Sequence, residues 1–256
     1  MRFSVSGVRG ERSWNAGAST PMVLASAQKV LVLRALTRIV AIDQRVLEGG
    51  VHVRELNRFY RAGTDAGAHE RSLLADGLAL ESLDAWVPVT RLALYMMRYS
   101  SNAASDALST LLEAPLQEVR AGAPFSETLR LPPLIVDQLA LTDADPNAGL
   151  YRASTRSLVD ALLDMEVTRP AAAPFDPFAY LPKLHGFGDS AVRGKKGRVP
   201  GHRAGAITAQ SRDGVALFAA YAFTTPAKDA SLEEAIEQAL ISMALSGASA
   251  ESLVHA

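Results

Sequence analysis

The sequence predicts an α+β fold in which an antiparallel sheet is flanked by helices. Residues 1–10 alternate polar and apolar side chains, as a half-buried strand does. Near the other end, residues 203–210 and 215–223 are two apolar runs separated by a Gly-containing turn, which is typical of a hairpin. Most of the chain between them has the apolar spacing of helices. We therefore expect both ends of the chain to build one sheet.

The individual elements follow from local patterns. A second strand is expected around residues 14–18, after the turn-like segment RGERSW. Residues 121–147 contain four prolines and predict a long ordered loop with short helical pieces, and 169–182 predict a Pro-rich connection. Helices are expected over residues 26–43, 87–100, 103–113, 154–165 and from the Ser231–Glu234 capping box to about 247.

Strands at both ends and helices in the middle predict two lobes. We expect a sheet lobe formed by residues 1–29 and 190–256, with a helical lobe formed by residues 30–189 inserted into it. The lobes would act as a single functional unit with the active site between them, because small-molecule pockets commonly lie where two lobes meet.

The bulk composition excludes several classes of function. The 256 residues carry a net charge of −1, so no overall field favours nucleic acid or a membrane surface. The chain has no cysteine, which excludes disulfides and thiolate catalysis. Its five histidines are scattered without metal-ligand spacing. We expect no cofactor, no nucleic-acid partner and no membrane partner, and the oligomeric state stays open.

No segment of the sequence predicts a targeting signal or a membrane span. The longest apolar region, residues 30–42, contains Arg34 and Arg38 and is too short to cross a bilayer. The chain as it stands is therefore expected to be cytoplasmic, and secreted or periplasmic if an export signal has been removed.

Ser26 and Lys29 stand three positions apart in the apolar stretch PMVLASAQKVLVLRAL. Residues i and i+3 share one face of a helix, so the Lys29 amine can reach the Ser26 hydroxyl. A serine becomes nucleophilic when a nearby base takes its proton, and burial lowers the pKa of a lysine toward that role. A chance pair, with Lys29 extended to the surface, has the same spacing.

Ser100 and Asn102 lie in a short break between two apolar helical segments, in YSSNAASDAL. A hydroxyl placed there could relay a proton, and an amide could hold a substrate. Serine and asparagine are also preferred at helix N-caps, where their role would be structural.

Lys195, Lys196 and Gly197 directly precede the C-terminal strands. A lysine on an edge strand could bind a substrate carboxylate, and the glycine would let the backbone approach the substrate closely. A solvated basic turn is the structural alternative.

Taken in order, at spacings of about 74 and 95 residues, the three segments resemble the Ser-x-x-Lys, Ser-x-Asn and Lys-[Thr/Ser]-Gly motifs of serine β-lactamases and penicillin-binding proteins. The resemblance is greatest to class A β-lactamases and covers nearly the whole chain. YRASTRSLVDALLDM is similar to the helix after their Ω-loop, and GKKGRVPGHRAGAI to the strand of their third motif. The resemblance implies a β-lactamase/transpeptidase-like fold.

The resemblance also implies a role for each matched catalytic residue. Ser26 would be the acylated nucleophile, and Lys29 would shuttle its proton. Ser100 would relay the proton to the leaving group, and Asn102 would contact the substrate and Lys29.

The remaining matched residues would bind the substrate. Lys195 would line the pocket and favour an anionic small molecule, and Arg203 would assist in binding its carboxylate. The backbone N–H groups of Ser26 and Arg198, the residue after Gly197, would form the oxyanion hole.

The sequence departs from the family pattern at three places. Ser101 replaces the Asp of the middle motif, which is a structural rather than a catalytic loss. Lys196 replaces the hydroxyl residue of the third motif, where a second ammonium would bind the same anion or narrow the pocket. Gln138 stands where class A enzymes carry the deacylating Glu, with Asp137 beside it and Glu127 upstream. Because Gln cannot take a proton from water, we expect acylation to be followed by slow deacylation.

Two classes of function follow from these residues. The first is a β-lactamase-like serine hydrolase that forms an acyl-enzyme at Ser26 with β-lactams or related amides and esters. The second is a low-turnover binding or sensor protein that retains the acyl group. An esterase or acyltransferase of biosynthetic pathways is a further alternative, and a cell-wall peptidase is disfavoured by the absence of a visible export signal or anchor.

Overall fold

The computed structural model describes residues 2–122, 130–142, 149–184, 192–210, 215–225 and 230–246. The chain divides into two compact units. The first comprises Met1–Val30, Tyr151–Asp164 and Pro182–Ala256, and the second comprises Leu31–Leu150 and Met165–Leu181.

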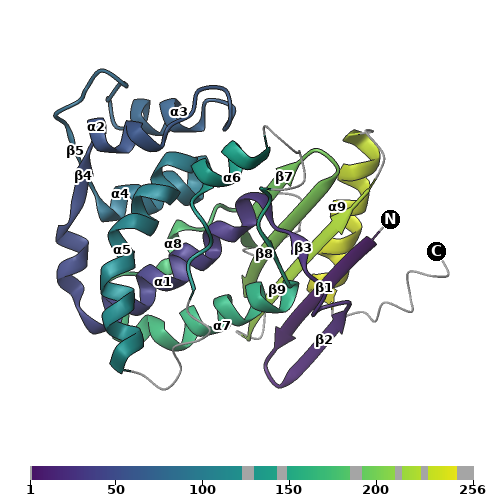
Figure 1. Ribbon diagram of the computed structural model, residues 1–256. Helices are drawn as coiled ribbons and strands as arrows, with labels where there is room; N and C mark the ends of the chain where they lie inside the picture. Colours follow the sequence, from purple (N-terminus) through teal and green to yellow (C-terminus); the bar gives the residue numbers. More distant parts are fainter. Residues whose placement is uncertain are drawn as a thin grey trace. The chain divides into compact units, whose positions relative to one another are not determined.

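The first unit is built on a five-stranded antiparallel sheet (Figure 1). Strand β1 from the start of the chain pairs with β9 from near its end, with Val5 opposite Tyr221. This pairing confirms that both ends of the chain build one sheet. In sheet order, the strands are β2 (Arg12–Ala16), β1 (Arg2–Arg9), β9 (Ala216–Thr224), β8 (His202–Gln210) and β7 (Arg193–Val199). The turn predicted between β8 and β9 lies outside the described residues.

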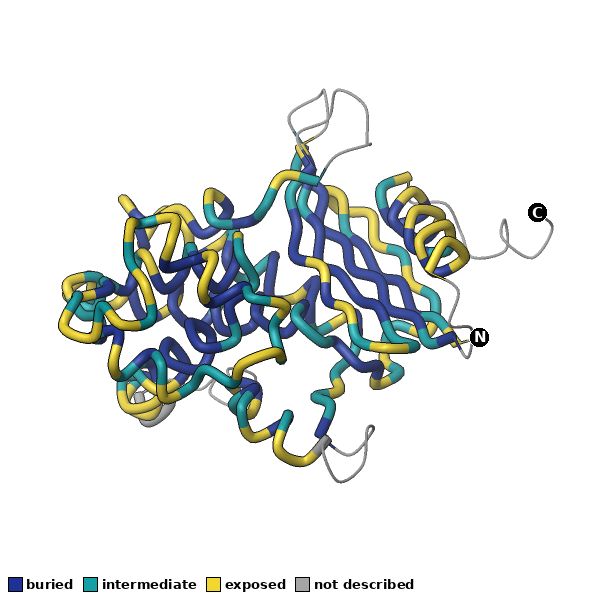
Figure 2. Tube along the Cα trace, turned by 90° about the horizontal axis from the view of Figure 1, so that it is seen from above, coloured by how far each residue is buried: buried dark blue, intermediate teal, exposed yellow. Residues whose placement is uncertain are grey.

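Helix α9 (Ala230–Ser246) covers one face of this sheet. In Figure 2 the inner strands are dark blue over most of their length, whereas α9 is largely yellow. A fully buried apolar side chain typically contributes about 1.5–3 kcal/mol to stability. The side chains that form the core on this face include Val5, Ile207, Leu217, Tyr221, Phe223, Leu240, Ile241 and Met243.

The opposite face of the sheet carries small side chains, including Ala204, Ala206, Ala220 and Ala222, because successive residues of a strand point to opposite faces. Small side chains allow the backbone of a neighbouring element to approach the sheet closely. This face therefore suits a tightly packed backbone segment better than a thick apolar layer.

Hydrogen bonds of Thr155 attach the start of helix α7 (Thr155–Ala172) to this small-residue face. The Thr155 Oγ1 atom lies 2.7 Å from the Ser4 Oγ atom and 3.0 Å from the Ser6 Oγ atom, and all three residues are buried. Just before α7, β6 (Arg152–Ala153) pairs with β3 (Met22–Val23). These bonds explain why residues 151–164 group with the sheet, whereas the sequence places them in the helical lobe.

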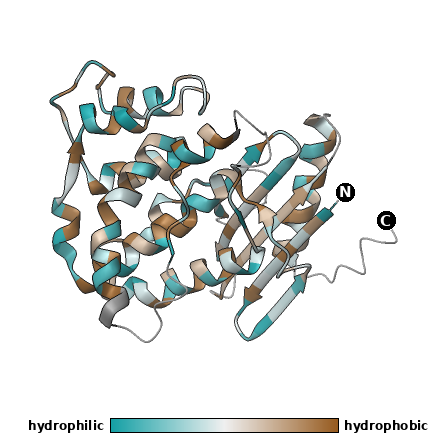
Figure 3. Ribbon diagram, in the orientation of Figure 1, coloured by the Kyte–Doolittle hydropathy of each residue, from teal (hydrophilic) through white to brown (hydrophobic). Residues whose placement is uncertain are grey.

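The second unit is mostly helical, and its helices carry both brown and teal residues in Figure 3, as amphipathic helices do. It also contains the two-stranded sheet of β4 (Gly50–His52) and β5 (Trp86–Pro88). Its helices are most of α1 (Lys29–Ile42), α2 (Val53–Leu56), α3 (Ala68–Leu74), α4 (Val89–Leu94), α5 (Asn102–Gly122), α6 (Ile135–Thr142), the later part of α7, α8 (Pro177–Tyr180), the short 3-10 helices η2 (Gln44–Glu48) and η3 (Asn57–Phe59), and the π-helical turn η4 (Tyr95–Tyr99).

Two helices are longer than the sequence predicts. Helix α5 continues from Asn102 to Gly122, and α7 continues through Pro170 to Ala172, so the start of the expected Pro-rich connection is helical. Pro170 stands in the last turn of α7, where the missing N–H removes a single helical hydrogen bond. Packing of an apolar face can therefore outweigh a local helix-ending signal.

Asp106 on α5 fixes the start of α6. Its carboxylate accepts hydrogen bonds from the backbone nitrogens of Ile135, at 2.7 Å, and Val136, at 2.8 Å. The first N–H groups of a helix have no partner within the helix, and a negative charge there also suits the helix dipole. This buried carboxylate positions the helix that carries Asp137 and Gln138.

Within the described part of the chain, no helix combines the length and hydropathy needed to cross a membrane.

Candidate functional site

Ser26 lies in a 3-10 turn, η1 (Ala25–Gln28), directly before α1. The sequence predicts an α-helix from Ser26 onward, but the first α-helical residue is Lys29. Ala25 enters the turn with a φ of 44°, a conformation that costs a non-glycine residue about 1–3 kcal/mol. Such strain is retained where the surrounding structure holds the backbone, and here it fixes the residue before Ser26.

Lys29 is completely buried, and its Nζ atom lies 3.5 Å from the Ser26 Oγ atom. The predicted approach of the two side chains is therefore present, whereas the alternative with Lys29 at the surface is absent. A buried amine within hydrogen-bonding reach of a hydroxyl can accept its proton when the amine is neutral.

Gly197 on β7 packs directly against the backbone of η1. A β-carbon at this position would lie 2.6 Å from the nitrogens of Ser26 and Ala27 and 2.4 Å from the Leu24 oxygen. Real β-carbons do not approach other atoms this closely, so only glycine allows this contact. The close approach that the sequence predicts for Gly197 is thus made to the turn that holds Ser26.

Lys195 lies on the same face of β7 as Gly197 and is 4% exposed. Burial and the positive charge of Lys29 hold the pKa of Lys195 well below its ordinary value. Two buried lysines with η1 beside them make this part of the first unit a candidate site for an anion or for a polarised carbonyl oxygen.

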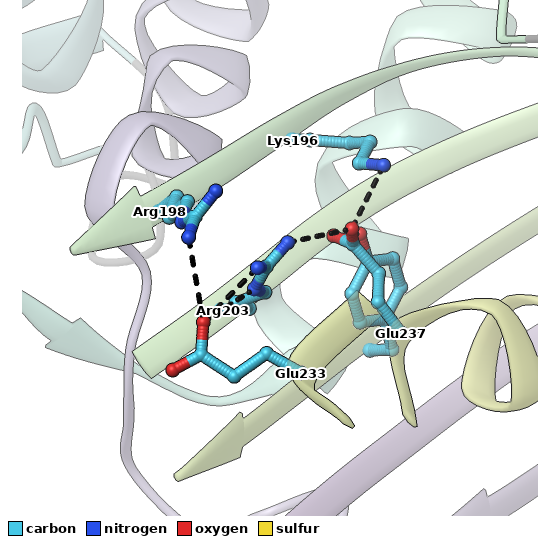
Figure 4. A network of polar contacts seen from close by, with 6 residues as sticks. Lys196, Arg198, Arg203, Glu233 and Glu237 are labelled. Atoms are coloured by element: carbon cyan, nitrogen blue, oxygen red, sulfur yellow. Dashed lines mark hydrogen bonds and ion pairs between the residues drawn. The ribbon is translucent and has the colours of Figure 1, made fainter. Parts of the chain in front are cut away.

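Lys196, Arg198 and Arg203 lie on the other face of the sheet, toward α9, and Figure 4 shows their contacts. Arg203 donates from Nε and Nη2 to one oxygen of Glu233, at 3.1 and 3.0 Å, and from Nη1 to Glu237, at 3.2 Å. The Lys196 ammonium lies 2.8 Å from Glu237, and a nitrogen of Arg198 lies 3.7 Å from Glu233. Lys196 and Arg203, whose side chains were predicted to bind a substrate carboxylate, thus already face protein carboxylates.

Tyr221 completes this network, because its hydroxyl donates a short hydrogen bond to Glu237. Burial and the neighbouring carboxylate raise the pKa of Tyr221 well above its ordinary value, so the phenol remains a donor. A β-carbon at Gly205 would overlap the Tyr221 ring, at 2.4 Å from its nearest atom. Gly205 therefore makes room for the ring that reaches Glu237.

Glu233, Glu237 and Tyr221 were not predicted as part of the site. Glu233 and Glu237 stand four residues apart on α9 and so share one face, which the sequence shows. Their partners lie between 16 and 41 positions earlier in the chain, and no local pattern identifies them.

Ser100, Ser101 and Asn102 lie in the second unit, at the junction of η4 and α5. Ser101 is fully buried, and its hydroxyl accepts a hydrogen bond from the Ala104 backbone nitrogen at 3.2 Å, which makes Ser101 the N-cap of α5. Ser100 has a φ of 69°, in the left-handed region that non-glycine residues seldom adopt. The capping role in this motif therefore falls on Ser101, with Ser100 held in an unusual conformation before it.

Gln138 is buried in α6, and its side-chain nitrogen donates to the Pro133 oxygen at 2.8 Å. Asp137 beside it is exposed. Gly149 packs against this helix so closely that a β-carbon there would overlap the Gln138 carbonyl. Glu127, the other carboxylate named from the sequence, lies outside the described residues.

The structure thus brings Ser26, Lys29, Lys195 and Gly197 together in the first unit. Ser100, Asn102, Asp137 and Gln138 belong to the second unit, and their part in a common site stays a prediction. Among the described residues, no group of three or more His, Asp or Glu side chains could hold a metal ion.

Two hollows of ≈ 490 and ≈ 510 Å³ lie in the second unit. Neither is lined by a residue predicted for the site. The larger is mostly apolar, with Ile39, Ile42, Val46 and Pro115 in its walls. The smaller is lined partly by polar side chains, namely Ser109, Thr110, Glu113 and Arg130, and Ser26 and Lys29 line neither hollow.

No protein-family model matches the chain, and no curated protein matches it. The solved structure of PBP-A is similar, with a TM-score of 0.67 and 17% identity over 96% of this chain and 91% of that chain. A mutant of PBP-A, described as an acyl-enzyme complex with penicillin G, has the same TM-score at 16% identity, with 96% of this chain and 91% of that chain covered.

Two β-lactamases are also similar. Those of Burkholderia vietnamiensis and Burkholderia ambifaria each have a TM-score of 0.59, at 15% and 14% identity, over 90% of this chain and 86% and 87% of theirs. The chain therefore has the fold of the serine β-lactamases and penicillin-binding proteins, as predicted.

Proposed function

We propose that this chain is a serine hydrolase of low turnover that forms an acyl-enzyme at Ser26 with β-lactams or related amides and esters. The observation that carries the proposal is the 3.5 Å distance between the buried Lys29 Nζ atom and the Ser26 Oγ atom. The fold shared with β-lactamases and with PBP-A supports the same chemistry.

In the proposed acylation, neutral Lys29 takes the hydroxyl proton of Ser26 as Oγ attacks the carbonyl carbon of the substrate. The new C–O bond forms, and the carbonyl oxygen becomes an oxyanion. When the oxyanion collapses, the bond to the leaving nitrogen or oxygen breaks, and the proton passes from Lys29 to the leaving group through Ser100. Lys29 is then neutral again.

The proposed oxyanion hole consists of the backbone N–H groups of Ser26 and Arg198. The packing of Gly197 against the Ser26 nitrogen supports this assignment, since it brings the β7 backbone beside η1. Removal of one donor from such a hole typically costs about 2.7–4 kcal/mol of transition-state stabilisation.

Deacylation is proposed to be slow because no carboxylate replaces the expected base at Gln138. The buried amide of Gln138 donates to Pro133, and an amide cannot remove a proton from water. PBP-A, a mutant of which is described as an acyl-enzyme complex with penicillin G, offers a structural parallel for an acyl adduct.

A pulse–chase experiment with a fluorescent penicillin tests the two parts of this proposal. The protein is labelled, excess unlabelled penicillin is added, and the bound label is followed in the wild type and in Ser26→Ala. We expect labelling of the wild type alone, with loss over many minutes. Loss within seconds, with hydrolysed product, would instead support an efficient β-lactamase, and labelling of Ser26→Ala would refute Ser26 as the nucleophile.

A further inference from the structure

The smaller hollow, of ≈ 490 Å³, is lined by helix α5 and by residues 130–134, the segment that leads into α6. On α5, Ser109, Glu113 and Leu116 follow one another at intervals of four and three residues, so they share one face of the helix. All the residues that line this hollow belong to the second unit, whereas Ser26 belongs to the first. We call it the polar hollow.

Residues 130–134 form a stiff wall of the polar hollow. Pro132 and Pro133 have a fixed φ and no backbone N–H, so this stretch has few conformations open to it. The Gln138 side-chain nitrogen donates to the Pro133 oxygen at 2.8 Å, and Asp106 on α5 accepts from the two backbone nitrogens that follow the segment. The polar hollow is therefore preformed, as small-molecule sites usually are.

Two opposite charges line the polar hollow, the Glu113 carboxylate and the Arg130 guanidinium. Both side chains are exposed, and in the part of the chain that the structure describes neither forms an ion pair, with the other or with a third residue. Closing the two exposed groups onto each other would contribute little to stability, so such a pair competes only weakly with a ligand. Both charges are thus available to a molecule in the polar hollow.

Ser109 adds a buried polar group on the same face of α5 as Glu113. It is 5% exposed, and its hydroxyl has no hydrogen-bond partner among the described residues. Buried hydroxyls are normally hydrogen-bonded, as is that of Thr110 beside it, which donates to the Asp106 oxygen at 2.9 Å. The Ser109 hydroxyl is therefore left to bond a ligand.

We propose that the polar hollow binds a small zwitterion with an apolar side chain, namely an apolar amino acid or a dipeptide. The carboxylate of the ligand pairs with Arg130, and its ammonium pairs with Glu113. A simple anion or cation would leave one of these two charges without a partner. The apolar side chain of the ligand has apolar walls to contact, formed by Leu116, Leu131, Pro132 and Leu134. This inference goes beyond the proposed function and does not depend on acylation at Ser26.

The test measures binding to the full chain by saturation-transfer NMR titration. Leucine and leucyl-leucine are the two zwitterions, and they distinguish a single amino acid from a dipeptide. N-acetyl-leucine lacks the ammonium, and leucinamide lacks the carboxylate. We expect at least one zwitterion to bind with a Kd on the order of 1 mM, and both analogues to bind about three- to tenfold more weakly than leucine.

The variants assign each charge of the ligand to its partner. Glu113→Gln should weaken the binding of leucine about three- to tenfold without weakening that of N-acetyl-leucine, which has no ammonium to lose. Arg130→Gln should do the same to leucine without weakening the binding of leucinamide. Glu118→Gln and Arg58→Gln are the matched controls, because both residues are exposed in the same unit and neither lines the polar hollow. Neither control should change any of these Kd values.

Ser109→Ala should weaken the binding of the zwitterion about threefold or more, since it removes a hydrogen bond to the ligand. It should not lower the melting temperature, because the hydroxyl bonds no other described residue. Melting curves also establish that the other variants are folded.

The inference is overturned if neither zwitterion binds at about ten times the expected Kd, or if N-acetyl-leucine and leucinamide both bind as tightly as leucine. Unchanged binding of leucine in both Glu113→Gln and Arg130→Gln would also overturn it. Ser26→Ala should retain binding, and its loss there would move the ligand to Ser26. None of these results bears on whether Ser26 is acylated, so a failure here is distinct from a failure of the proposed function.

Discussion

Gly197 lies so close to Ser26 that a β-carbon at position 197 would come within 2.6 Å of the Ser26 backbone nitrogen. The contact joins β7, the strand that carries the third motif, to the turn that holds the proposed nucleophile, across 171 positions of sequence. It leaves no room for any side chain, so the position of Ser26 depends on the absence of one at Gly197.

Gly197→Ala should therefore displace η1 and disable Ser26. We expect at least about a hundredfold slower adduct formation, because a small misplacement of a catalytic group is costly. Overpacking should also lower the free energy of unfolding by about 1–3 kcal/mol. Acylation kinetics and urea unfolding measure the two effects. Gly63→Ala is the control for acylation, since no atom lies within 4 Å of a β-carbon there, whereas its φ of 80° strains an alanine and by itself lowers the free energy of unfolding. Normal acylation by Gly197→Ala would contradict the proposed packing.

Lys195→Met should stabilise the protein at neutral pH while it slows acylation. The pKa of Lys195 is held well below its ordinary value of 10.5 by burial and by Lys29. Between the lowered pKa of Lys195 in the folded protein and its ordinary value of 10.5 in the unfolded chain, the unfolded chain binds more protons than the folded chain. The free energy of unfolding of the wild type therefore rises with pH toward 10.5. The variant lacks this rise. We expect Lys195→Met to be about 1–4 kcal/mol more stable than the wild type at pH 7, as when a buried charge is replaced by an apolar side chain. This difference in the free energy of unfolding should narrow by about pH 10.

Urea unfolding of both proteins at several pH values measures this gap. A gap that stays constant, or that widens as the pH rises, would show that the ammonium of Lys195 is not disfavoured in the folded protein.

Thr155→Val should loosen the attachment of α7 to the sheet. The substitution removes the partner of two buried hydroxyls, Ser4 and Ser6, and we expect a loss of about 1–3 kcal/mol in the free energy of unfolding. Thr37→Val is the control. Thr37 is equally buried, but its hydroxyl donates to the Leu33 oxygen within its own helix, where the backbone also supplies a donor. Equal losses in the two variants would contradict a special role for Thr155.

Gln138→Glu should shorten the lifetime of the acyl adduct if Gln138 occupies the place of the deacylating base. General-base catalysis typically contributes 10²–10⁴-fold, so we expect at least about a tenfold shorter lifetime. The variant loses the hydrogen bond to Pro133, which should cost about 1 kcal/mol of stability. The pulse–chase experiment measures the lifetime.

Asp137→Asn serves as the paired variant, because Asp137 is the neighbouring exposed carboxylate. It should leave the lifetime unchanged. If the acyl adduct instead lives longer in Asp137→Asn and no shorter in Gln138→Glu, the residual deacylation is assigned to Asp137.

The sequence predicted those features that depend on local spacing. Alternation identified β1, and two apolar runs around a turn identified the two C-terminal strands. The three-residue interval between Ser26 and Lys29 placed both side chains together. The glycine at position 197 was expected to permit a close backbone approach, and the structure identifies η1 as the segment that approaches.

Features that depend on distant partners were not predictable in this way. The cluster of Glu233 and Glu237 with the cations of β7 and β8 joins residues 30 to 41 positions apart. No local pattern indicated that Lys196 and Arg203 would already be paired. Likewise, the early part of α7 joins the sheet because Thr155 meets Ser4 and Ser6, about 150 positions earlier in the chain.

The most direct test of acylation at Ser26 is the intact mass of the protein after incubation with a penicillin, a cephalosporin and an activated ester. Wild type, Ser26→Ala and the exposed-serine control Ser13→Ala are compared. We expect wild type and Ser13→Ala to gain the mass of one acyl group from at least one of these compounds, and Ser26→Ala to gain none. An adduct of equal yield on Ser26→Ala, or neither an adduct nor turnover in the wild type with any of the three compounds, would contradict the proposed chemistry.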